Sequence, residues 1–192
     1  MHLVAEYLDG TKTEGEAKIP NPRSRIKHLF LTDKDAVPTK DALDSIKEAD
    51  IIILSPGSLY TSLIPNLIIK GMSEMIANSP AFKIYVCNVM TQHGETDSYT
   101  AYDHVKAIVE HANKKVIDAC LVNIGEAPLT ALSRYQHEHS YPVVPDVNKI
   151  REMGYKVVTA DLLNITDYVR HDAKKLNQAI IKLIETNRII KR

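Results

Sequence analysis

The sequence contains few cysteines, no excess charge of either sign and no long hydrophobic run. Cys87 and Cys120 are the only two cysteines in 192 residues, and each follows or lies within a hydrophobic stretch. We interpret both as small core residues in a reducing compartment, not as a disulfide or metal pair. Basic and acidic side chains each total 24, so charge gives no reason to expect nucleic acid or a membrane surface as a partner.

Signals for membrane insertion and export are also missing. No stretch approaches the roughly 20 apolar residues of a membrane-spanning helix. The first residues lack the pattern of a secretory signal peptide. We therefore expect a cytoplasmic protein without a membrane span. Hydrophobic residues at 44% and charged residues at 25% are typical of an ordinary globular chain.

Several catalytic and metal-binding motifs lack a required residue. The loop around Gly57 has neither the lysine of a nucleotide P-loop nor the three glycines of a dinucleotide fingerprint. Ser58 lacks the second glycine of a nucleophile elbow. His137 and His139 stand at alternate positions, where their side chains point apart, and no third ligand is evident. We therefore assign no catalytic residue and no metal ligand.

Hydrophobic runs with strand character alternate with segments of helical periodicity along the chain. The expected strands are residues 26–31, 51–54, 82–88, 118–124, 143–144 and 155–160. The expected helices are residues 39–49, 63–76, 100–113, 128–135, 146–154 and 171–192. This alternation predicts a single α/β domain over residues 1–192 with a mostly parallel sheet.

The N-terminal residues predict a β-hairpin. Asp9-Gly10 separates two short runs, residues 3–8 and 11–19, and this dipeptide suits a two-residue hairpin turn. After the hairpin, we expect strand 26–31, its following helix and strand 51–54 to form one β-α-β unit. A second unit then leads to strand 82–88.

The stretch from residue 51 to residue 62 has the pattern of a ligand-binding loop. Residues 51–54 are all apolar, which is typical of a central parallel strand buried on both faces. Pro56 and Gly57 then predict a sharp turn that uses the conformational freedom of glycine. Hydroxyl side chains follow at Ser58, Tyr60, Thr61 and Ser62. Amides at a helix start attract anions, so we expect a phosphate there. A simple turn with Ser62 as an N-cap is an equally good interpretation.

A second polar loop, residues 88–96, follows the next expected strand. Ligands of open α/β sheets bind beyond the carboxyl ends of the strands, so both loops are expected to face one crevice. The amides of Asn66 and Asn88 are expected either to hold a ligand or to tie the loops together. Thr91, Gln92 and Glu95 share this loop, but a single carboxylate does not make a metal site.

Residues 55–62 with Ile64-Pro65-Asn66, and residues 85–92 with Gly94-Glu95-Thr96, resemble the gluconeogenesis-factor (YvcK) family. That family is related to the phospholactate transferase CofD. The resemblance continues through Arg134-Tyr135, Pro142-Val143, Asp161-Leu162 and Val169-Arg170-His171-Asp172. It implies a Rossmann-like, three-layer α/β/α fold. Members of the family begin with a glycine-rich half that this sequence lacks, so we expect a match to their carboxyl-terminal portion.

The resemblance also implies a function. The family is associated with binding UDP-sugars, with carbon-source adaptation, with cell shape and with self-association. Tyr135 would offer a flat face to uracil or sugar, and Arg170 a planar fork to a diphosphate. A core-edge tyrosine and a surface arginine are the structural alternatives. The remaining expected ligand contacts are Gly57, Ser58, Leu59, Tyr60, Thr61, Ser62, Asn66, Asn88, Thr91 and Gln92.

Two other functions are compatible with these residues. A CofD-like transferase would move a phospholactyl-type group from a nucleotide donor to an alcohol. Residues 58–62 and 89–92 match the gluconeogenesis-factor branch better than the transferase branch. In the third interpretation the crevice is empty and the chain only binds other proteins. We expect the nucleotide-sugar ligand and no further cofactor.

Overall fold

The computed structural model describes residues 1–21, 23–165 and 168–190, and it confirms a mixed α/β fold. Its strands are β1 (Leu3–Tyr7), β2 (Lys12–Glu14), β3 (Ile26–Leu31), β4 (Ile51–Leu54), β5 (Phe82–Val86), β6 (Ala119–Asn123), β7 (Lys156–Ala160), β8 (Leu163–Asn164) and β9 (Arg170–His171). Its helices are the 3-10 helix η1 (Glu16–Lys18), α1 (Lys40–Glu48), the π-helix η2 (Leu59–Leu63), α2 (Ile64–Leu67), α3 (Met72–Asn78), α4 (Ala101–Ala112), α5 (Leu129–Gln136), α6 (Val147–Glu152) and α7 (Ala173–Ile190). None of these described helices combines the length and hydrophobicity needed to cross a bilayer.

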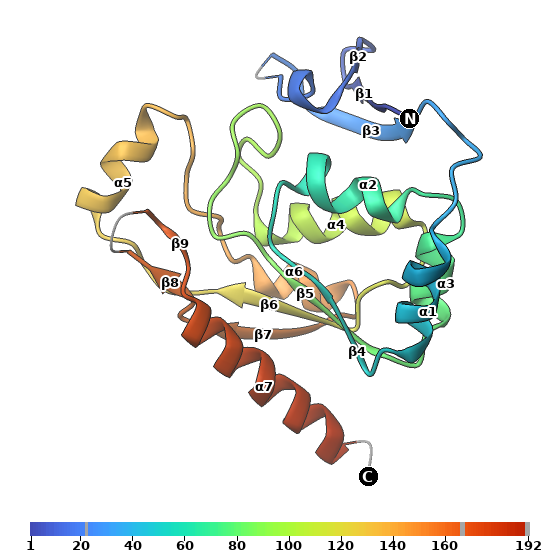
Figure 1. Cartoon of the computed structure of the whole chain (residues 1–192). Helices are drawn as coiled ribbons and strands as arrows, with labels where there is room; N and C mark the ends of the chain where they lie inside the picture. The colour runs from blue at the N-terminus through green and yellow to red at the C-terminus, as the bar shows by residue number, and fades with distance from the viewer. Residues whose placement is uncertain (22, 166–167, 191–192) are drawn as a thin grey trace.

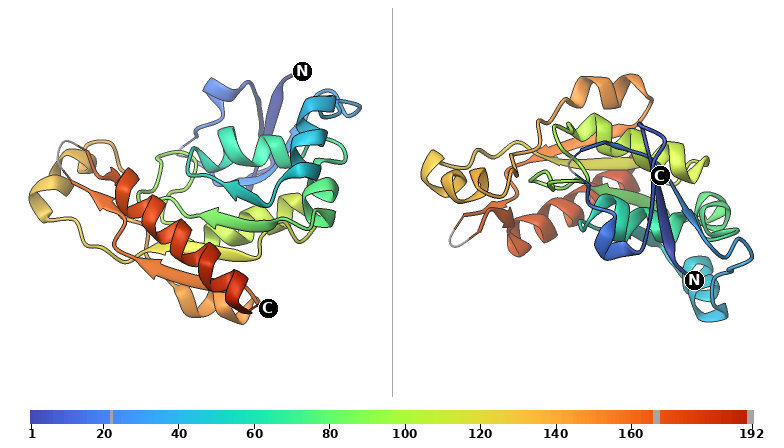
Figure 2. Two further views of the ribbon diagram at one scale, coloured as in Figure 1. Left: turned by 60° about the horizontal axis from the view of Figure 1, so that its bottom comes forward. Right: turned by 90° about the horizontal axis from the view of Figure 1, so that it is seen from above.

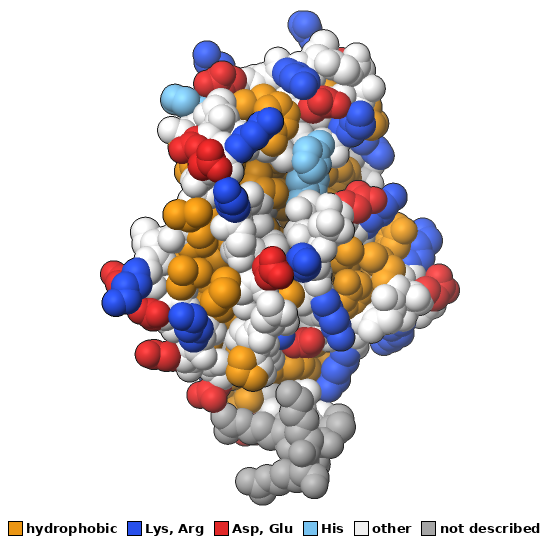
Figure 3. All heavy atoms as spheres, turned by 90° about the vertical axis from the view of Figure 1, so that its right-hand side faces the viewer, with side chains coloured by type: hydrophobic (Ala, Val, Ile, Leu, Met, Phe, Trp, Pro, Cys, Tyr) orange, Lys and Arg blue, Asp and Glu red, His pale blue; other side chains and the backbone are white. Residues whose placement is uncertain are grey.

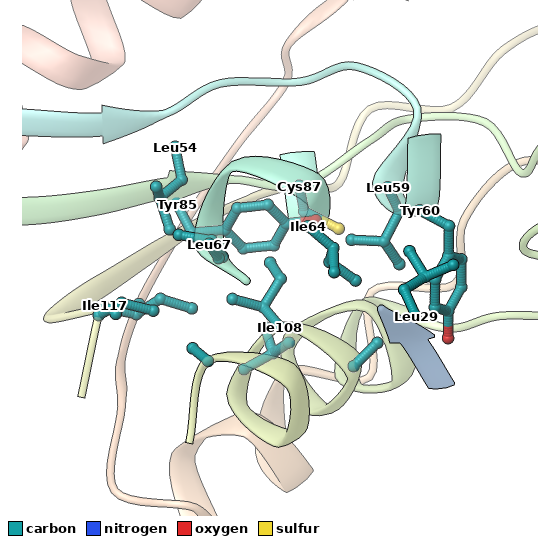
Figure 4. Close-up of a cluster of buried hydrophobic side chains, with 14 of the residues drawn as sticks. Leu29, Leu54, Leu59, Tyr60, Ile64, Leu67, Tyr85, Cys87, Ile108 and Ile117 are labelled. Atoms are coloured by element: carbon teal, nitrogen blue, oxygen red, sulfur yellow. The ribbon is translucent and has the colours of Figure 1, made fainter. Parts of the chain in front are cut away.

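The central element is a four-stranded parallel sheet in the order β4-β5-β6-β7. The helices α2 and α4 lie on one side of this sheet and α7 on the other (Figures 1 and 2). Alternate residues of β5 therefore enter different cores. Tyr85 packs with Ile64 of α2 and Ile108 of α4 (Figure 4), whereas Ile84 packs with residues of α7. This arrangement confirms the expected three-layer α/β/α fold.

The strand β4 lies at the edge of the sheet, where sequence analysis expected a central strand. It pairs on one side, with β5, through the register Ile51↔Phe82 to Leu54↔Tyr85. As a result Ile53 is 44% exposed. A strand whose residues are all apolar predicts that both of its faces are covered, but its composition does not say how many neighbours it has. The expected central position was therefore wrong.

The N-terminal strands form a separate antiparallel sheet in the order β2-β1-β3. The hairpin across Asp9-Gly10 is confirmed. The expected β-α-β unit from β3 to β4 is wrong, because β3 pairs with β1, with Val4 opposite Phe30. This small sheet packs on the α2 and α4 side through buried residues that include Leu29 (Figure 4).

The helical segment after β4 begins earlier and is more interrupted than expected. The N–H groups of Ser62 and Leu63 both donate to the Ser58 carbonyl, at 2.9 and 3.1 Å, so helical structure starts before the expected N-cap Ser62. The chain then breaks at Gly71, whose φ of 84° is left-handed. The expected continuous helix over residues 63–76 is thus three short helices.

Two further expectations differ in detail. Residues 143–144 form no strand; instead, isolated bridges join Met90 to Pro142 and Thr100 to Val144. His171 belongs to β9, and α7 begins two residues later at Ala173. The cysteines behave as expected: both are buried free thiols, and burial raises the pKa of Cys87 to about 12.

Candidate functional site

The loops that follow β4 and β5 are bonded directly to one another. Asn88 Nδ2 donates to the Gly57 carbonyl at 2.8 Å, and Asn88 Oδ1 accepts from the Gly57 N–H at 3.4 Å. Ser58 Oγ donates to Gln92 Oε1 at 2.8 Å. Of the two roles left open for Asn88, these bonds support tying the loops together.

The carboxylate of Glu95 occupies the start of η2, where a ligand phosphate was expected. The Glu95 side chain is buried; it accepts hydrogen bonds from the Tyr60 N–H (3.3 Å), the Thr61 hydroxyl (3.0 Å) and Gln92 Nε2 (2.8 Å). A helix start favours negative charge because its first amides lack intrahelical partners. The protein supplies that charge itself, which disfavours a diphosphate at the expected position over residues 57–62.

The protonation of Glu95 depends on two opposing effects. Burial raises the pKa of Glu95 above its usual 4.5, and this is the largest effect. Hydrogen bonds from the Thr61 hydroxyl and from the Tyr60 amide lower the pKa, because they stabilise the ionised form. The carboxylate is therefore held by neighbouring donors at a position that is otherwise costly for a charge.

Three of the expected ligand contacts have side chains inside the protein. Leu59 and Tyr60 are 1% and 2% exposed, and the Tyr60 hydroxyl lies 2.7 Å from that of Tyr99. Thr91 Oγ1 accepts from the Tyr141 N–H at 2.9 Å, and the Thr91 side chain is buried. These side chains hold the two loops and residues 140–144 in place, and the assignment of these residues as ligand contacts stays a prediction.

The other residues of the first loop lie at its surface. Ser62 and Asn66 are both exposed, and Asn66 Nδ2 donates to the Ser62 carbonyl at 2.7 Å. Gly57 is also exposed, and its φ lies outside the left-handed region. The expectation that this turn needs the conformational freedom of glycine is therefore wrong. A β-carbon at Gly57 would be 3.6 Å from Ser62 Cβ, an ordinary contact.

A cavity of about 370 Å³ opens beyond the carboxyl ends of β5 and β6. Residues 123–127 and residues 142–145 form two of its walls, and Leu132, Leu163 and Val169 close a third side. Most of this lining is apolar, with Asn123 and Glu126 as polar members. Small-molecule sites in proteins commonly have this size and composition.

Asn123 shapes the wall of this cavity that follows β6. Its Oδ1 accepts from the N–H groups of Gly125 (3.1 Å) and Leu162 (2.9 Å), and its Nδ2 donates to the Gly125 carbonyl (2.9 Å). A β-carbon at Gly125 would collide with the carboxylate of Asp161. That carboxylate accepts from Lys175 Nζ at 2.7 Å, which lowers the pKa of Asp161.

Sequence analysis did not propose these residues for the site, although a signal was present. The rule that selected the loops after residues 54 and 86 applies equally to the strand that ends at Asn123. Asn123 and Gly125 are a polar residue and a glycine at that strand end. Applying the rule to the third strand would have placed residues 123–127 in the site.

Tyr135 and Arg170 are both connected to Val169 of the cavity lining, but their environments differ. Tyr135 is buried, and its hydroxyl accepts a hydrogen bond from the Val169 N–H at 2.7 Å. Arg170 is exposed and directly follows Val169, which lines the cavity. The structure thus places Tyr135 against the cavity wall, whereas Arg170 is the next residue after Val169 along the chain and is not among the residues that line the cavity. Among the described residues, no group of histidine, cysteine, aspartate and glutamate side chains is placed to hold a metal ion.

Comparison with known families agrees with this architecture. The family model described as 2-phospho-L-lactate transferase CofD matches residues 1–163. The chain belongs to the CofD family. This CofD-family chain is 42% identical over 181 residues to a gluconeogenesis factor of Halalkalibacterium halodurans, covering 94% of the chain and 56% of the relative. It is 41% identical over 184 residues to the gluconeogenesis factor of Bacillus subtilis, covering 95% of the chain and 58% of the relative.

A solved structure extends the comparison to three dimensions. The crystal structure of a UPF0052-family protein from Bacillus halodurans matches the CofD-family chain with a TM-score of 0.90 at 42% identity. The match covers 94% of this chain and 58% of that protein. The chain therefore spans somewhat more than half the length of these relatives. The expected family and fold are both confirmed.

Proposed function

We propose that this CofD-family chain binds a nucleotide sugar of the UDP-sugar class. The observation that supports the proposal is the cavity of about 370 Å³ beyond the carboxyl ends of β5 and β6. Its apolar walls suit a nucleobase, and the Glu126 carboxylate at its lining suits the hydroxyls of a sugar. Arg170, the exposed residue that follows the cavity-lining Val169, is the side chain for the diphosphate, because a guanidinium binds phosphate oxygens in pairs.

This proposal moves the diphosphate from the start of η2 to Arg170, the residue after Val169 of the cavity lining. Glu95 already supplies a negative charge at the helix start, and a phosphate beside it would be repelled. In the proposed site, Tyr135 acts by holding Val169 in the cavity wall. The ring of Tyr135 contacts the ligand only if the wall opens.

The biological role belongs to the same proposal. Both bacterial relatives are called gluconeogenesis factors, which supports a regulatory role in carbon metabolism, exercised in the cytoplasm. Participation in cell-shape control and assembly into a homo-oligomer rest on the family resemblance alone. In this role the bound nucleotide sugar reports a metabolic state and is not consumed.

Calorimetric titration of UDP-N-acetylglucosamine into the protein tests the proposal. We expect saturable heat for the wild type. Arg170→Ala should weaken binding about tenfold or more, because it removes a charge-assisted contact. Val144→Trp should abolish binding because Val144 lines the cavity and is 58% exposed, so a larger side chain there fills the space.

Val37→Trp is the matched control for the cavity variant. Val37 is 66% exposed and lies outside the cavity, so the same substitution there should leave binding unchanged. Absence of heat with the wild type, or equal binding by the wild type and both site variants, contradicts the proposal.

The family model supports one second candidate, a transferase. Its description names 2-phospho-L-lactate transferase. In such a reaction an acceptor hydroxyl oxygen attacks the donor phosphorus, its proton goes to a base, and the bond to the departing nucleoside monophosphate breaks. Chromatography of the protein incubated with a nucleotide-activated 2-phospholactate and an acceptor alcohol distinguishes the two candidates. Release of nucleoside monophosphate with formation of the phosphodiester product would favour the transferase.

A further inference from the structure

Two histidines from distant parts of the chain face one another across a short antiparallel contact. An isolated bridge joins Met90, in the loop after β5, to Pro142, in the segment after α5. Counting three residues forward from Met90 and three back from Pro142, the same register sets His93 opposite His139. Their ring centroids are 4.8 Å apart, and the ring planes are inclined by 38°. The fold therefore places two exposed imidazoles side by side.

The carboxylate of Asp97 fixes which nitrogen of His93 carries the proton. His93 Nδ1 lies 2.9 Å from Asp97 Oδ1, and the other oxygen of Asp97 accepts from the Gly94 N–H at 2.7 Å. An ionised carboxylate only accepts hydrogen bonds, so Nδ1 of His93 is the donor. In the neutral ring Nε2 then presents its lone pair. Histidines that bind metals commonly bond a carboxylate through their other nitrogen, which orients the ring and makes it a better ligand.

The backbone of His139 adopts a conformation that is uncommon for its residue type. Its φ is 51°, in the left-handed region. The Ser140 N–H donates to the Tyr135 carbonyl at 3.1 Å, as in the helix-ending motif whose left-handed position is usually glycine. Residues held in such conformations are often found at functional sites. Here the conformation belongs to the residue whose ring lies beside His93.

A second histidine pair in the protein shows what makes this one available. The rings of His28 and His111 are also 4.8 Å apart. His111, however, uses Nε2 to accept from the Leu29 N–H and bonds a helix carbonyl through Nδ1. Both of its nitrogens are therefore engaged. His93 differs, because its bond to a carboxylate engages Nδ1 and leaves Nε2 for another partner.

We propose that His93 and His139 together bind a divalent transition-metal ion of the zinc type. Imidazole nitrogens suit zinc, copper and nickel. Two imidazoles on one tetrahedral zinc, with bonds of about 2.0–2.1 Å, have ring centres roughly 5 Å apart, close to the observed 4.8 Å. The described residues include no group of three or more metal-binding side chains, so water supplies the remaining ligands. Asp97 acts as a positioning residue for His93.

The metal would join two segments that already hold each other in place. The Thr91 N–H donates to the Tyr141 carbonyl at 2.7 Å, and the Tyr141 N–H donates to Thr91 Oγ1 at 2.9 Å. These bonds fix the backbone beside both histidines, which is the support that a metal site requires. Residues 142–145 continue from this segment into the wall of the cavity. A bound metal therefore stabilises that wall, whether or not the proposed nucleotide sugar binds there.

Calorimetric titration of Zn²⁺ into the protein tests the proposal. The wild type should bind one zinc ion more than the double variant His93→Gln/His139→Gln. Each single variant should weaken this binding at least about tenfold, and Asp97→Asn should weaken it by about tenfold or more through the orientation of His93. In NMR spectra, zinc should shift the imidazole signals of His93 and His139. Zinc should also raise the thermal midpoint of the wild type more than that of the double variant, because it binds the folded state.

The matched controls are substitutions of other exposed histidines. His137 and His28 are both exposed, and His137→Gln and His28→Gln should leave zinc binding unchanged. Magnesium ions, which prefer oxygen ligands, should not compete with zinc. Equal zinc binding by the wild type and the double variant overturns the proposal. So does a loss of binding in His137→Gln as large as that in His139→Gln, or displacement of the zinc by an equal concentration of magnesium.

Discussion

The Thr61 hydroxyl donates a 3.0 Å hydrogen bond to the Glu95 carboxylate, joining the loop after β4 to the loop after β5. The same carboxylate accepts from the Tyr60 amide at the start of η2. A feature that resembled an anion-binding site in the sequence is therefore satisfied from within the protein. Its consequence is structural: hydrogen bonds join the two loops.

Replacing Glu95 by glutamine tests this internal role. Glu95→Gln keeps one carbonyl oxygen but loses the charge and places an amide donor against the Tyr60 N–H or the Thr61 hydroxyl. We expect a loss of about 1–3 kcal/mol in the free energy of unfolding at pH 7, the cost of a poorly paired buried polar group. Urea denaturation measures it. Glu74→Gln, at an exposed position, should change stability by less than about 0.5 kcal/mol.

The pH dependence of Glu95 has a definite sign. Burial raises the pKa of Glu95 above 4.5, so the folded state holds this proton more tightly than the unfolded chain does. Glu95 therefore contributes to the free energy of unfolding below about pH 4.5. This contribution is lost as the pH rises through the pKa that Glu95 has in the folded state. The stability difference between wild type and Glu95→Gln should therefore be larger at pH 4 than at pH 7. An equal difference at both pH values would contradict this assignment.

His111 should make the attachment of the N-terminal sheet sensitive to acid. His111 Nε2 accepts from the Leu29 N–H at 3.1 Å, while Nδ1 lies 2.7 Å from the Ala107 carbonyl. Nδ1 must therefore carry the proton, and protonating Nε2 removes the acceptor for Leu29. Figure 3 shows histidine side chains gathered on this side of the molecule; the His28 ring stacks on His111 at 4.8 Å.

Burial lowers the pKa of His111 below 6.5, and the neighbouring His28 adds to this effect. The unfolded chain then binds the proton more tightly than the folded protein does. The contribution of His111 to the free energy of unfolding is therefore complete at neutral pH and is lost as the pH falls below 6.5. His111→Gln keeps an acceptor without titrating and should reduce the loss of stability between pH 7 and pH 5, as measured by urea denaturation. His137→Gln, at an exposed position, should leave the pH profile unchanged. A His111→Gln profile identical to that of wild type would refute the assignment.

Substitution by alanine should affect stability strongly at one glycine and little at another. At Gly125 the added β-carbon meets the Asp161 carboxylate, so Gly125→Ala should destabilise the protein by about 1–3 kcal/mol, as overpacking does. At Gly57 the contact is ordinary and φ is not left-handed, so Gly57→Ala should be nearly neutral. Thermal denaturation of both variants measures the difference, and a larger loss at Gly57 would show that this account is mistaken.

Tyr135→Phe separates support of the cavity wall from direct ligand contact. Removing the hydroxyl leaves the Val169 N–H without its 2.7 Å partner, so we expect a loss of about 1–3 kcal/mol in the free energy of unfolding. Because the proposed role of Tyr135 is to hold Val169 and not to touch the nucleotide sugar, affinity should change little under conditions where the variant is folded. Unchanged stability together with lost binding would instead identify the hydroxyl as a ligand contact.

The strands of the main sheet could be predicted because each is a short apolar run bounded by turn residues. The strand expected over residues 51–54 was found with the same bounds, and the strand expected over residues 82–88 was found over 82–86, for this local reason. The position of β4 in the sheet could not be predicted. An apolar strand sequence indicates that both faces of the strand are buried, but it does not indicate which strand lies beside it. The separate N-terminal sheet was missed for the same reason: pairing of β3 with β1 is a choice between distant partners.

The site was only partly predictable. The proximity of the two loops followed from the rule that ligands bind beyond the carboxyl ends of parallel strands. The role of Glu95 did not follow, because it lies 34 residues after Thr61 along the chain, and nothing in either loop alone shows that they interlock. The Tyr135 to Val169 bond spans a similar separation.

The amino-acid sequence by itself determined the α/β class, the family, and the loops that meet at the carboxyl edge of the sheet. These features depend on local periodicity, turn residues and contiguous motifs. Only the tertiary structure decided that β4 stands at an edge, that a glutamate fills the helix start, and that the open cavity lies beyond β6. Each depends on contacts between residues far apart in the chain, where packing and hydrogen bonding select one partner among many.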